Sequence, residues 1–384
     1  MLVLLYISEV HHHKLTSVVR TAVTGWNSDA NNDVTDSKDF IKQYKSILIW
    51  NNSPKVIETA IFGFGHDPFV LEGCEFSDCA IFNQESAASL PLEEFDAVIV
   101  QISTMWLSDL PENRTNHQRF IFFAQESPAS MTESLTDIFS MRNYFNWTMS
   151  YRTNSDIQFL YGRIQPGPTA PKTREETLRL MKDNRNNNKN YAANKIKLVA
   201  WMVGHCDTLG LREIYVSQLA KFIPIDVYGK CGNMSCSRNT MHAYSDPQCY
   251  QMLEAKYKFY LSFENSICEE YVTEKFFEIA NRDIVPVVYG GADYKRIAPP
   301  HSFIDALEFT PEALAQYLTI LDANDELYNE FFWWKSHYKV EAGLEQMARH
   351  GFCDLCKKLH QDQVPKCYPQ LETEWDPKNK CWEN

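Results

Sequence analysis

The segment KFYLSFENSICEEYVTEKFFE, residues 258–278, changes from an apolar run to a polar loop and then to a charged amphipathic stretch. The run predicts a strand that ends near Phe263, and the stretch predicts a helix that starts near Thr273, a residue type favoured at a helix N-cap. Lys275 then lies in the first helical turn, where a positive charge is unfavourable unless an anion is close. The segment therefore predicts either an anion site or, with Glu274, a pair of solvated surface charges.

Neighbouring segments repeat the alternation of strand and helix, which predicts a parallel, doubly wound sheet with its ligand site at the carboxyl ends of the strands. Three earlier apolar runs that end in polar loops predict another α/β layer in the first half of the chain. The expected strands are 46–50, 95–103, 119–128, 197–203, 225–229, 258–263 and 284–291, and the expected helices are 211–222 and 273–283.

The length of 384 residues exceeds what one hydrophobic core usually organises, so we expect two domains. Residues 165–190 are rich in Pro, Asn and charge and have room for one exposed helix, which makes them the best linker candidate. We divide the chain into a stem-like segment 1–44, a first domain 45–164, a linker 165–195, a second domain 196–335 and a C-terminal segment 336–384 that returns to the first domain.

The charge pattern and the absence of standard motifs narrow the chemistry. A net charge of −13 argues against a nucleic-acid-binding protein, which would normally carry a basic face. The sequence contains no G-x-x-x-x-G-K-[ST] loop, and GFGHDP at 63–68 lacks the last glycine of the dinucleotide fingerprint. Any phosphate would therefore be held by arginine and lysine side chains.

Eleven cysteines bear on the compartment. The spacings Cys74-x4-Cys79 and Cys353-x2-Cys356 are compatible with a structural zinc or with two disulfides. Three N-glycosylation acceptors favour an oxidising secretory lumen, and an odd number of cysteines leaves at least one thiol free or paired between chains. The acceptors are Asn113, Asn146 and Asn233.

The start of the chain carries no strong targeting segment. The apolar run at residues 2–7 is too short to cross a bilayer, which takes about 20 residues, and is short for a signal core. The three histidines at 11–13 indicate a solvated linker rather than a metal site.

Six segments carry distinctive motifs: YKFYLSFENS, YVTEKFFE, VPVVYGGADY, APPHSFID, FFAQESP at 122–128 and FNWTMSYRTNSDI at 145–157. Together these motifs resemble the α1,3-fucosyltransferases of glycosyltransferase family 10. The resemblance extends from about residue 45 to residue 360, and the Cys-rich insert GKCGNMSCSRNT at 229–240 is similar to the invertebrate and plant branch. Two places depart from the family pattern, Gly204-His205-Cys206 and Thr153-Asn154.

The resemblance implies a GT-B fold, with two Rossmann-like domains facing across a cleft. It implies that L-fucose is transferred from GDP-fucose, with inversion, in α1,3 linkage to N-acetylglucosamine of a glycoprotein or oligosaccharide. The branch favours the N-glycan core as acceptor, with antennal, Lewis-type glycans as the alternative. A catalytically silent glycan-binding protein of the secretory pathway is a further alternative.

The same resemblance assigns roles to individual residues. Arg212 and Lys275 would stabilise the leaving diphosphate, while Asn265, Tyr271 and Glu274 would bind the ribose, the phosphates and the fucose. Glu126, at a predicted strand end, would be the base that removes the acceptor proton. Two further residues could line the cleft or form a core aromatic and a structural ion pair; these are Tyr151 and Arg152.

The resemblance also implies partners and a location. No metal is expected to be obligatory, although Mn²⁺ could stimulate the reaction. Family members are generally type II membrane proteins of the Golgi lumen, so we expect an N-terminal anchor that this sequence does not fully contain. We also predict that Cys74 and Cys79 pair with Cys353 and Cys356, which would return the end of the chain to the first domain.

Overall fold

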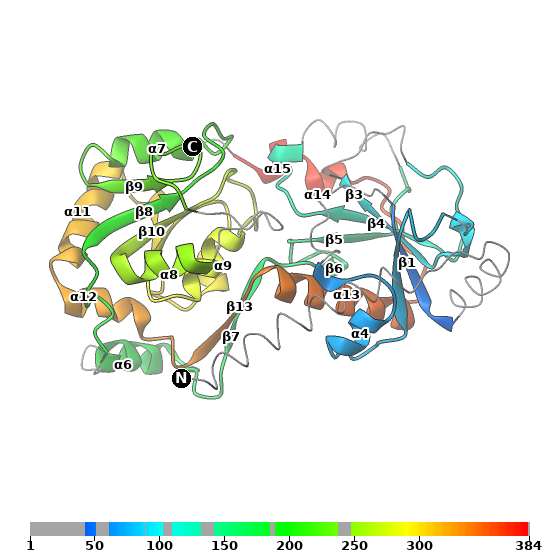
Figure 1. Cartoon of the computed structure of the whole chain (residues 1–384), viewed down its shortest axis with the longest axis horizontal. Coiled ribbons are helices and arrows are strands. Elements are labelled where there is room, and N and C mark those ends of the chain that lie inside the picture. The colour runs from blue at the N-terminus through cyan, green and yellow to red at the C-terminus, as the bar shows by residue number, and fades with distance from the viewer. Residues whose placement is uncertain are drawn as a thin grey trace, which may run out of the picture. The chain divides into compact units, whose positions relative to one another are not determined.

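The structure is a computed structural model, and it describes residues 43–50, 61–88, 90–102, 110–131, 142–184, 189–236 and 247–382. Within this part of the chain, strands and helices alternate and build two parallel sheets (Figure 1). Both sheets belong to one compact unit, Tyr44–Asn384. The apolar run at 2–7, the three histidines and nearly all of the stem-like segment lie outside the described residues.

The first sheet has the strand order β2-β1-β3-β4-β5-β6, and every neighbouring pair is parallel. All residues of β3 and five of the six residues of β4 are buried, which explains their continuous apolar sequences. The strands are β1 (Lys45–Ile49), β2 (Cys79–Asn83), β3 (Ala97–Gln101), β4 (Arg119–Ala124), β5 (Trp147–Ser150) and β6 (Ile157–Gln158).

The second sheet has the order β12-β11-β10-β8-β9, again fully parallel. Its chain order reverses between β8 and β10, and such a switch point is where open α/β sheets bind ligands. The expectation of two Rossmann-like α/β sheets is therefore confirmed. The strands are β8 (Lys197–Met202), β9 (Ile225–Tyr228), β10 (Tyr257–Phe263), β11 (Val285–Tyr289) and β12 (Ile304–Asp305).

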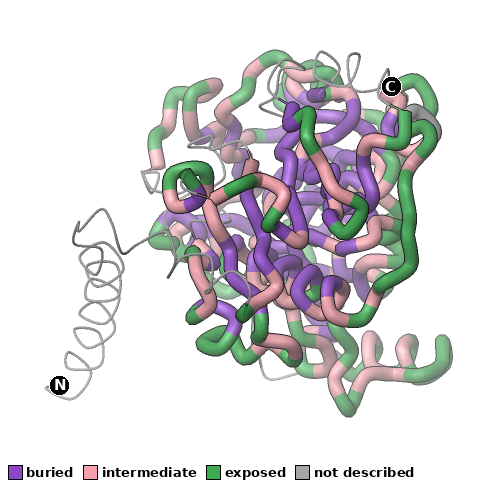
Figure 2. The backbone as a smooth tube through the Cα atoms, turned by 90° about the vertical axis from the view of Figure 1, so that its right-hand side faces the viewer, coloured by how far each residue is buried: buried purple, intermediate pink, exposed green. Residues whose placement is uncertain are grey.

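Helices follow most strands of the second sheet and accompany the first sheet. Figure 2 shows that the buried residues are concentrated in the interior of the molecule, while exposed residues lie largely at its periphery. The helices are α4 (Asp67–Leu71), α6 (Arg174–Asn184), α7 (Arg212–Leu219), α8 (Pro247–Lys256), α9 (Glu274–Ala280), α10 (Tyr294–Ile297), α11 (Pro311–Asp322), α12 (Asp325–Asn329), α13 (Leu344–Gln361), α14 (Glu372–Trp375) and α15 (Pro377–Lys380), with 3₁₀ turns at Leu92–Glu94, Ala129–Met131, Ala306–Glu308 and Glu330–Phe332.

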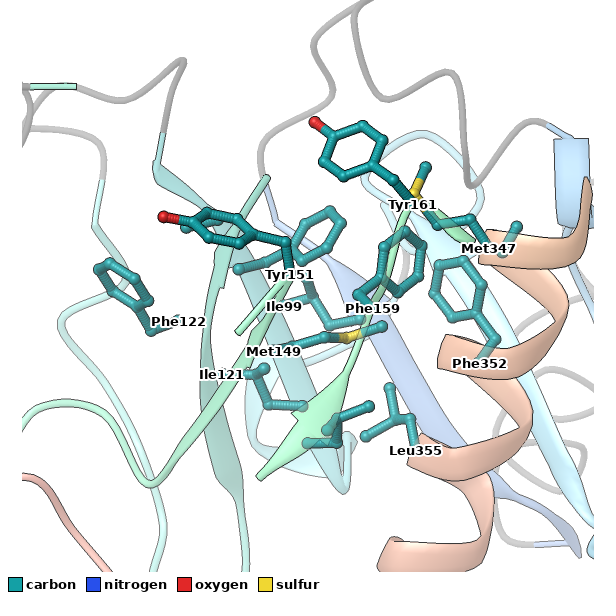
Figure 3. Close-up of a cluster of buried hydrophobic side chains, with 14 of the residues drawn as sticks. Ile99, Ile121, Phe122, Met149, Tyr151, Phe159, Tyr161, Met347, Phe352 and Leu355 are labelled. Carbon is teal, nitrogen blue, oxygen red and sulfur yellow. The ribbon is translucent and has the colours of Figure 1, made fainter. Parts of the chain in front are cut away.

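The C-terminal segment returns to the first sheet through α13. Its buried face, which includes Met347, Phe352 and Leu355, packs beside Phe159 in the hydrophobic cluster of Figure 3. Gly351 is required at the closest point, because a Cβ atom there would lie 1.9 Å from the Phe159 ring. The segment therefore completes the core of the first sheet.

The start of the expected linker differs from the prediction. Residues 165 and 166 belong to β7 (Gly162–Pro166), which pairs antiparallel with β13 (Tyr338–Ala342). The strand was missed because its partner lies far along the chain and because Pro166 suggested a loop. Proline is tolerated there because it is the last residue of a two-stranded ribbon.

The cysteines form five disulfides. The expected cysteines are joined as Cys74–Cys353 and Cys79–Cys356, which fasten α13 to the first sheet. The other bridges are Cys206–Cys231, Cys236–Cys249 and Cys268–Cys381, and the free thiol is Cys367.

One expected glycosylation site is wrong. Asn146 is buried, its Nδ2 donates to the Lys366 carbonyl at 2.8 Å, and its Oδ1 accepts from the backbone N–H of Phe120 at 2.8 Å. A glycan on Nδ2 would break this arrangement, so the asparagine is a structural residue. Asn113 and Asn233 are exposed and stay predicted sites.

A search of the described helices found none that is long and apolar enough to cross a membrane.

The two bridges between α13 and the first sheet are nested, so we expect their contributions to be strongly non-additive. The first to close constrains a loop of 279 or 277 residues, worth about 5–6 kcal/mol in the chain-entropy model, and the second then closes a ring of only about ten residues, worth about 2–3 kcal/mol. Removing either bridge alone should lower the free energy of unfolding by about 2–3 kcal/mol. The two double variants are Cys74→Ser with Cys353→Ser and Cys79→Ser with Cys356→Ser. Removing both should lower it by about 8 kcal/mol.

Urea denaturation under oxidising conditions measures these differences, and Cys367→Ser is the matched control. A loss in the quadruple variant that equals the sum of the two double variants would contradict the nested arrangement.

A second prediction concerns Lys335, which caps the carboxyl end of α9. Its Nζ donates to the carbonyls of Ala280 and Arg282, each at 2.7 Å, and burial lowers the pKa of Lys335 to about 8 although Asp283 acts in the opposite direction. Between this pKa and the unfolded value near 10.5, the unfolded state binds more protons, so the contribution of Lys335 to stability rises with pH. Raising the pH from about 7 to about 9.5 should therefore stabilise the wild type but not Lys335→Met. The free energy of unfolding of the variant minus that of the wild type should fall by on the order of 2 kcal/mol.

Denaturation curves of both proteins across this pH range test the prediction. Taking the difference between them cancels every other titrating group, and a difference that does not change with pH would show that the Lys335 pKa is not lowered.

Candidate active site

A buried carboxylate organises the end of β10. Glu264 follows this fully buried strand and is itself 0% exposed. Its Oε1 accepts from the backbone N–H of Thr273 at 2.8 Å, and both of its carboxylate oxygens accept from the Thr273 hydroxyl, at 3.0 and 2.9 Å. Glu264 thus satisfies the polar groups of the residue that precedes α9, which is why the Thr273 side chain makes no capping bond of its own to the helix.

Lys275, in the first turn of α9, is held by the same carboxylate. Its Nζ lies 3.2 Å from Glu264 Oε2, 3.1 Å from Glu274 Oε1 and 2.8 Å from Thr273 Oγ1. Burial alone would lower the pKa of Lys275, but Glu264 and Glu274 outweigh it and raise that pKa, so the side chain stays an ammonium. In this structure the negative charge beside Lys275 comes from the protein's own glutamates. The Lys275 side chain is still 25% exposed, so its charge also remains reachable from solvent.

A second carboxylate comes from the first sheet. Glu126 lies just after β4, and the buried Tyr271 donates its hydroxyl hydrogen to Glu126 Oε2 at 3.0 Å. Burial, with a smaller effect from Glu126, raises the pKa of Tyr271 well above its usual value, so the phenol stays protonated and remains a donor. A second hydrogen bond joins the same two loops, since Ser127 Oγ donates to Ser266 Oγ at 2.9 Å. The loop after β4 therefore meets the loop after β10.

Arg212 begins α7 at the switch point, but its guanidinium is buried. Its Nη1 donates to the Phe263 carbonyl at 2.5 Å and its Nη2 to the His205 carbonyl at 3.4 Å, while Nε has no hydrogen-bond partner among the described residues. Burial lowers the pKa of Arg212 despite the nearby charge of Glu264. In this conformation Arg212 fastens the loop after β8 to the end of β10, and direct contact with a diphosphate stays a prediction.

Asn265 directly follows Glu264 in the loop after β10. Its carbonyl accepts from the N–H of Gly210 at 2.8 Å, and a Cβ atom at Gly210 would lie only 3.2 Å from that carbonyl oxygen, which favours glycine here. The side-chain Oδ1 of Asn265 is buried and has no hydrogen-bond partner within the described residues. An acceptor atom of this kind is suited to a ligand hydroxyl.

Tyr151 and Arg152 take the structural role that the sequence left open. The Tyr151 ring packs edge-on against Tyr271, with centroids 5.1 Å apart, and belongs to the buried cluster drawn in Figure 3. The buried Arg152 pairs through Nη2 with Glu269 at 3.3 Å and through Nε with Glu270 at 3.8 Å. Arg152 therefore joins the first sheet to the loop after β10.

The two departures from the family pattern also make structural contacts. The Thr153 N–H donates to Glu270 Oε2 at 3.1 Å, and Asn154 Nδ2 donates to Glu374 Oε2 at 3.1 Å. Cys206 is joined to Cys231, so the Gly204-His205-Cys206 stretch is fixed beside the end of β9.

Comparison with known proteins shows the family to which the chain belongs. A profile described as "Glycosyltransferase family 10 (fucosyltransferase) C-term" matches residues 192–375, and one described as "Fucosyltransferase, N-terminal" matches residues 42–162. A human 4-galactosyl-N-acetylglucosaminide 3-α-L-fucosyltransferase is 32% identical over 294 residues, covering 74% of this chain and 69% of the relative. The chain belongs to glycosyltransferase family 10.

Two relatives from Drosophila melanogaster are more similar in sequence to this family 10 chain. Its α-(1,3)-fucosyltransferase C is 38% identical over 75% of the chain, and its glycoprotein 3-α-L-fucosyltransferase A is 39% identical over 62%. The matches span 66% and 45% of the lengths of these relatives. A solved α1,3-fucosyltransferase structure with GDP-fucose aligns with a TM-score of 0.47 at 14% identity, covering 85% of this chain and 97% of that one.

Sequence reasoning did not assign Glu264 to the site of this family 10 protein. The available signal was its position, because a charged residue directly after a fully apolar strand must be paired if the strand end is buried. Three other carboxylates near the first sheet are poorly placed to act as the base. Glu93 and Glu94 precede β3 and so lie at the opposite edge of the first sheet from Glu126, and Asp156 accepts from the Thr148 N–H and from Tyr368.

A cavity in the described part of the chain lies away from these residues. It has a volume of about 390 Å³, and it contains none of the predicted donor-binding residues. The APPHSFID motif contributes much of its wall, beside β12. The lining residues are Lys295, Pro300, His301, Phe303, Ile304, Asp305, Glu308, Phe309, Tyr317 and Phe331.

One group among the described residues has the geometry of a metal site, Cys79, Cys356 and His360. Its two cysteines are joined in a disulfide, which removes the thiolates that a metal would need.

The two glutamates around Lys275 differ in burial, so we expect their removal to have different effects on stability. Glu264→Gln keeps the shape but turns an amide toward the Lys275 ammonium, and it should lower the free energy of unfolding by about 1–3 kcal/mol. Glu274→Gln, at a partly exposed position, should change it by less than about 0.5 kcal/mol. Urea denaturation of both variants measures the difference, and equal effects would show that Glu264 does not organise this strand end.

Proposed function

We propose that this protein transfers L-fucose from GDP-fucose, with inversion, to the 3-hydroxyl of an N-acetylglucosamine residue. The observation that carries the proposal is the meeting of Glu126 from the first sheet with the Lys275 cluster of the second sheet through Tyr271. Family membership and the names of the relatives support the donor and the linkage. A transfer needs a base on one reactant and a positive charge on the other, and these two loops supply both.

In the proposed reaction, Lys275 faces the departing diphosphate. The bond between the fucose anomeric carbon and the phosphate oxygen breaks, and its electron pair remains on the diphosphate as GDP leaves. Lys275 stabilises this new negative charge, and the ion pair with Glu264 holds the ammonium in place. The buried Arg212 adds positive charge at the same strand end, where low polarity strengthens its effect.

Glu126 acts on the acceptor. Its carboxylate takes the proton of the sugar hydroxyl as that oxygen forms a bond to the anomeric carbon, on the face opposite the departing phosphate. The hydrogen bond from Tyr271 fixes the carboxylate orientation and leaves its second oxygen to accept the proton. In the proposal, Asn265 and Glu274 accept hydrogen bonds from the hydroxyls of the donor.

For the acceptor we favour the innermost N-acetylglucosamine of N-glycans. The Cys-rich insert supports this choice, and one of the fly relatives is named as a glycoprotein fucosyltransferase. The human relative is named for a galactosylated N-acetylglucosamine acceptor, which keeps antennal glycans as the alternative. Incubation with GDP-fucose and a panel of defined core and antennal glycans, followed by mass spectrometry and linkage analysis, distinguishes the two. Residence in the Golgi lumen, membrane anchoring and any stimulation by Mn²⁺ stay predictions.

Glu126→Gln tests the base directly. The amide keeps the shape and can still accept the Tyr271 hydrogen bond but cannot take a proton, so kcat should fall by about 10²–10⁴ while GDP affinity changes less than about threefold. Initial rates with GDP-fucose and calorimetric titration with GDP measure the two effects.

Glu94→Gln is the matched control, since Glu94 lies at the other edge of the same sheet and should leave kcat unchanged. Near-normal turnover of a folded Glu126→Gln protein would exclude Glu126 as the base. Glycan binding by the wild type without GDP binding or turnover would instead favour the silent binding protein.

A further inference from the structure

The end of the described chain is fastened to the loop that follows β10. The Glu269 N–H donates to the Lys380 carbonyl at 2.7 Å, and the Trp382 N–H donates to the Ile267 carbonyl at 3.0 Å. Between these two bonds, Cys268 and Cys381 are joined by a disulfide, and Lys380 pairs with Glu269 at 2.8 Å. Residues 380–382 therefore lie along residues 267–269 as a short, covalently fixed antiparallel ribbon.

This loop is the one that builds the candidate active site. Ser266, directly before the ribbon, contacts Ser127, the residue next to Glu126, and Tyr271, three residues after Cys268, donates to Glu126 itself. In Figure 1 the segment after α15 runs toward the side of the second sheet. The position of Trp382 is thus fixed relative to the proposed base by a few short and rigid connections.

The side chain of Trp382 is unusual for so constrained a residue. It is 49% exposed, whereas five other tryptophans of the described chain are buried, namely Trp147, Trp201, Trp333, Trp334 and Trp375. Exposed apolar side chains also flank a second contact to this loop, the hydrogen bond from the Gly210 N–H to the Asn265 carbonyl. The residues on either side of Gly210 are Leu209, 59% exposed, and Leu211, 38% exposed. Apolar surface therefore borders a site whose central side chains are charged.

We propose that Trp382 is a stacking surface for a pyranose ring of the acceptor glycan, beyond the sugar that receives fucose. The inference rests on the proposed transfer to a glycan. A pyranose ring presents C–H groups on its face and hydroxyls at its edge, and the indole face carries negative electrostatic potential that attracts those C–H groups. Lys275, Glu264 and Glu126 can handle charge and protons, but they offer no apolar face to a sugar ring. Trp382 supplies one on a rigid backbone, so little entropy is lost on binding.

Trp382→Ala tests the proposal in the full chain, with Cys381 and its disulfide intact. The KM for an oligosaccharide acceptor should rise about five- to tenfold, while kcat and the KM for GDP-fucose stay within about twofold, because only acceptor binding is lost. Trp382→Phe should restore most of the affinity. A single N-acetylglucosamine derivative, which lacks the second ring, should bind wild type and variant equally weakly.

Val364→Ala is the matched control, since Val364 is an apolar residue of the same C-terminal segment and is 70% exposed. An unchanged acceptor KM in Trp382→Ala would overturn the proposal, and so would an equal rise in the donor KM, which would indicate a disturbed loop. If the wild type transfers no fucose, the proposed function fails. Calorimetric titration of wild type and Trp382→Ala with the glycan then still decides whether the indole binds sugar.

Discussion

The carboxylate of Glu264, enclosed at the end of β10, is the constraint on which the rest of the site depends. A charge in this position must be compensated, and the compensation comes from Thr273 and Lys275 at the start of α9. The pairing fixes the direction in which α9 leaves the sheet, and with it the path of the loop that carries Tyr271. The helix is anchored at its other end by Lys335, so both ends are set by buried charged groups.

In the proposed transfer, the two sheets contribute different parts of the chemistry. The first provides a partly exposed glutamate after β4, and the second provides a lysine whose ammonium form is stabilised by two glutamates. Each of these groups would be of little use alone, because the transfer requires both removal of the acceptor proton and stabilisation of the leaving diphosphate. Hydrogen bonds between the loops, Ser127 to Ser266 and Tyr271 to Glu126, set their spacing.

Much of this was accessible from sequence because long apolar runs such as those of β4, β8, β10 and β11 are buried on both faces and are hard to mistake. Two-residue strands such as β6 and β12, and β7 with its distant partner β13, leave no comparable pattern. Side-chain roles were less predictable, since the same residue type serves opposite purposes. Arg212, predicted to stabilise a diphosphate, also binds the Phe263 carbonyl, and Asn146 was expected to carry a glycan and instead joins β4 to the C-terminal segment. Only three-dimensional neighbours decide between such alternatives.

The long separation of Cys74 and Cys79 from their partners has a consequence for biosynthesis. Their partners are made 279 and 277 residues later, which at ordinary elongation rates is roughly fifteen seconds to a minute. Throughout this interval the N-terminal half is present on the ribosome with two unpaired thiols and without the helix that completes its core, while the nearby pairs Cys206–Cys231 and Cys236–Cys249 can already close. Correct pairing of Cys74 and Cys79 therefore has to wait until α13 has been made, and any disulfide that either thiol forms earlier must be exchanged for the native one.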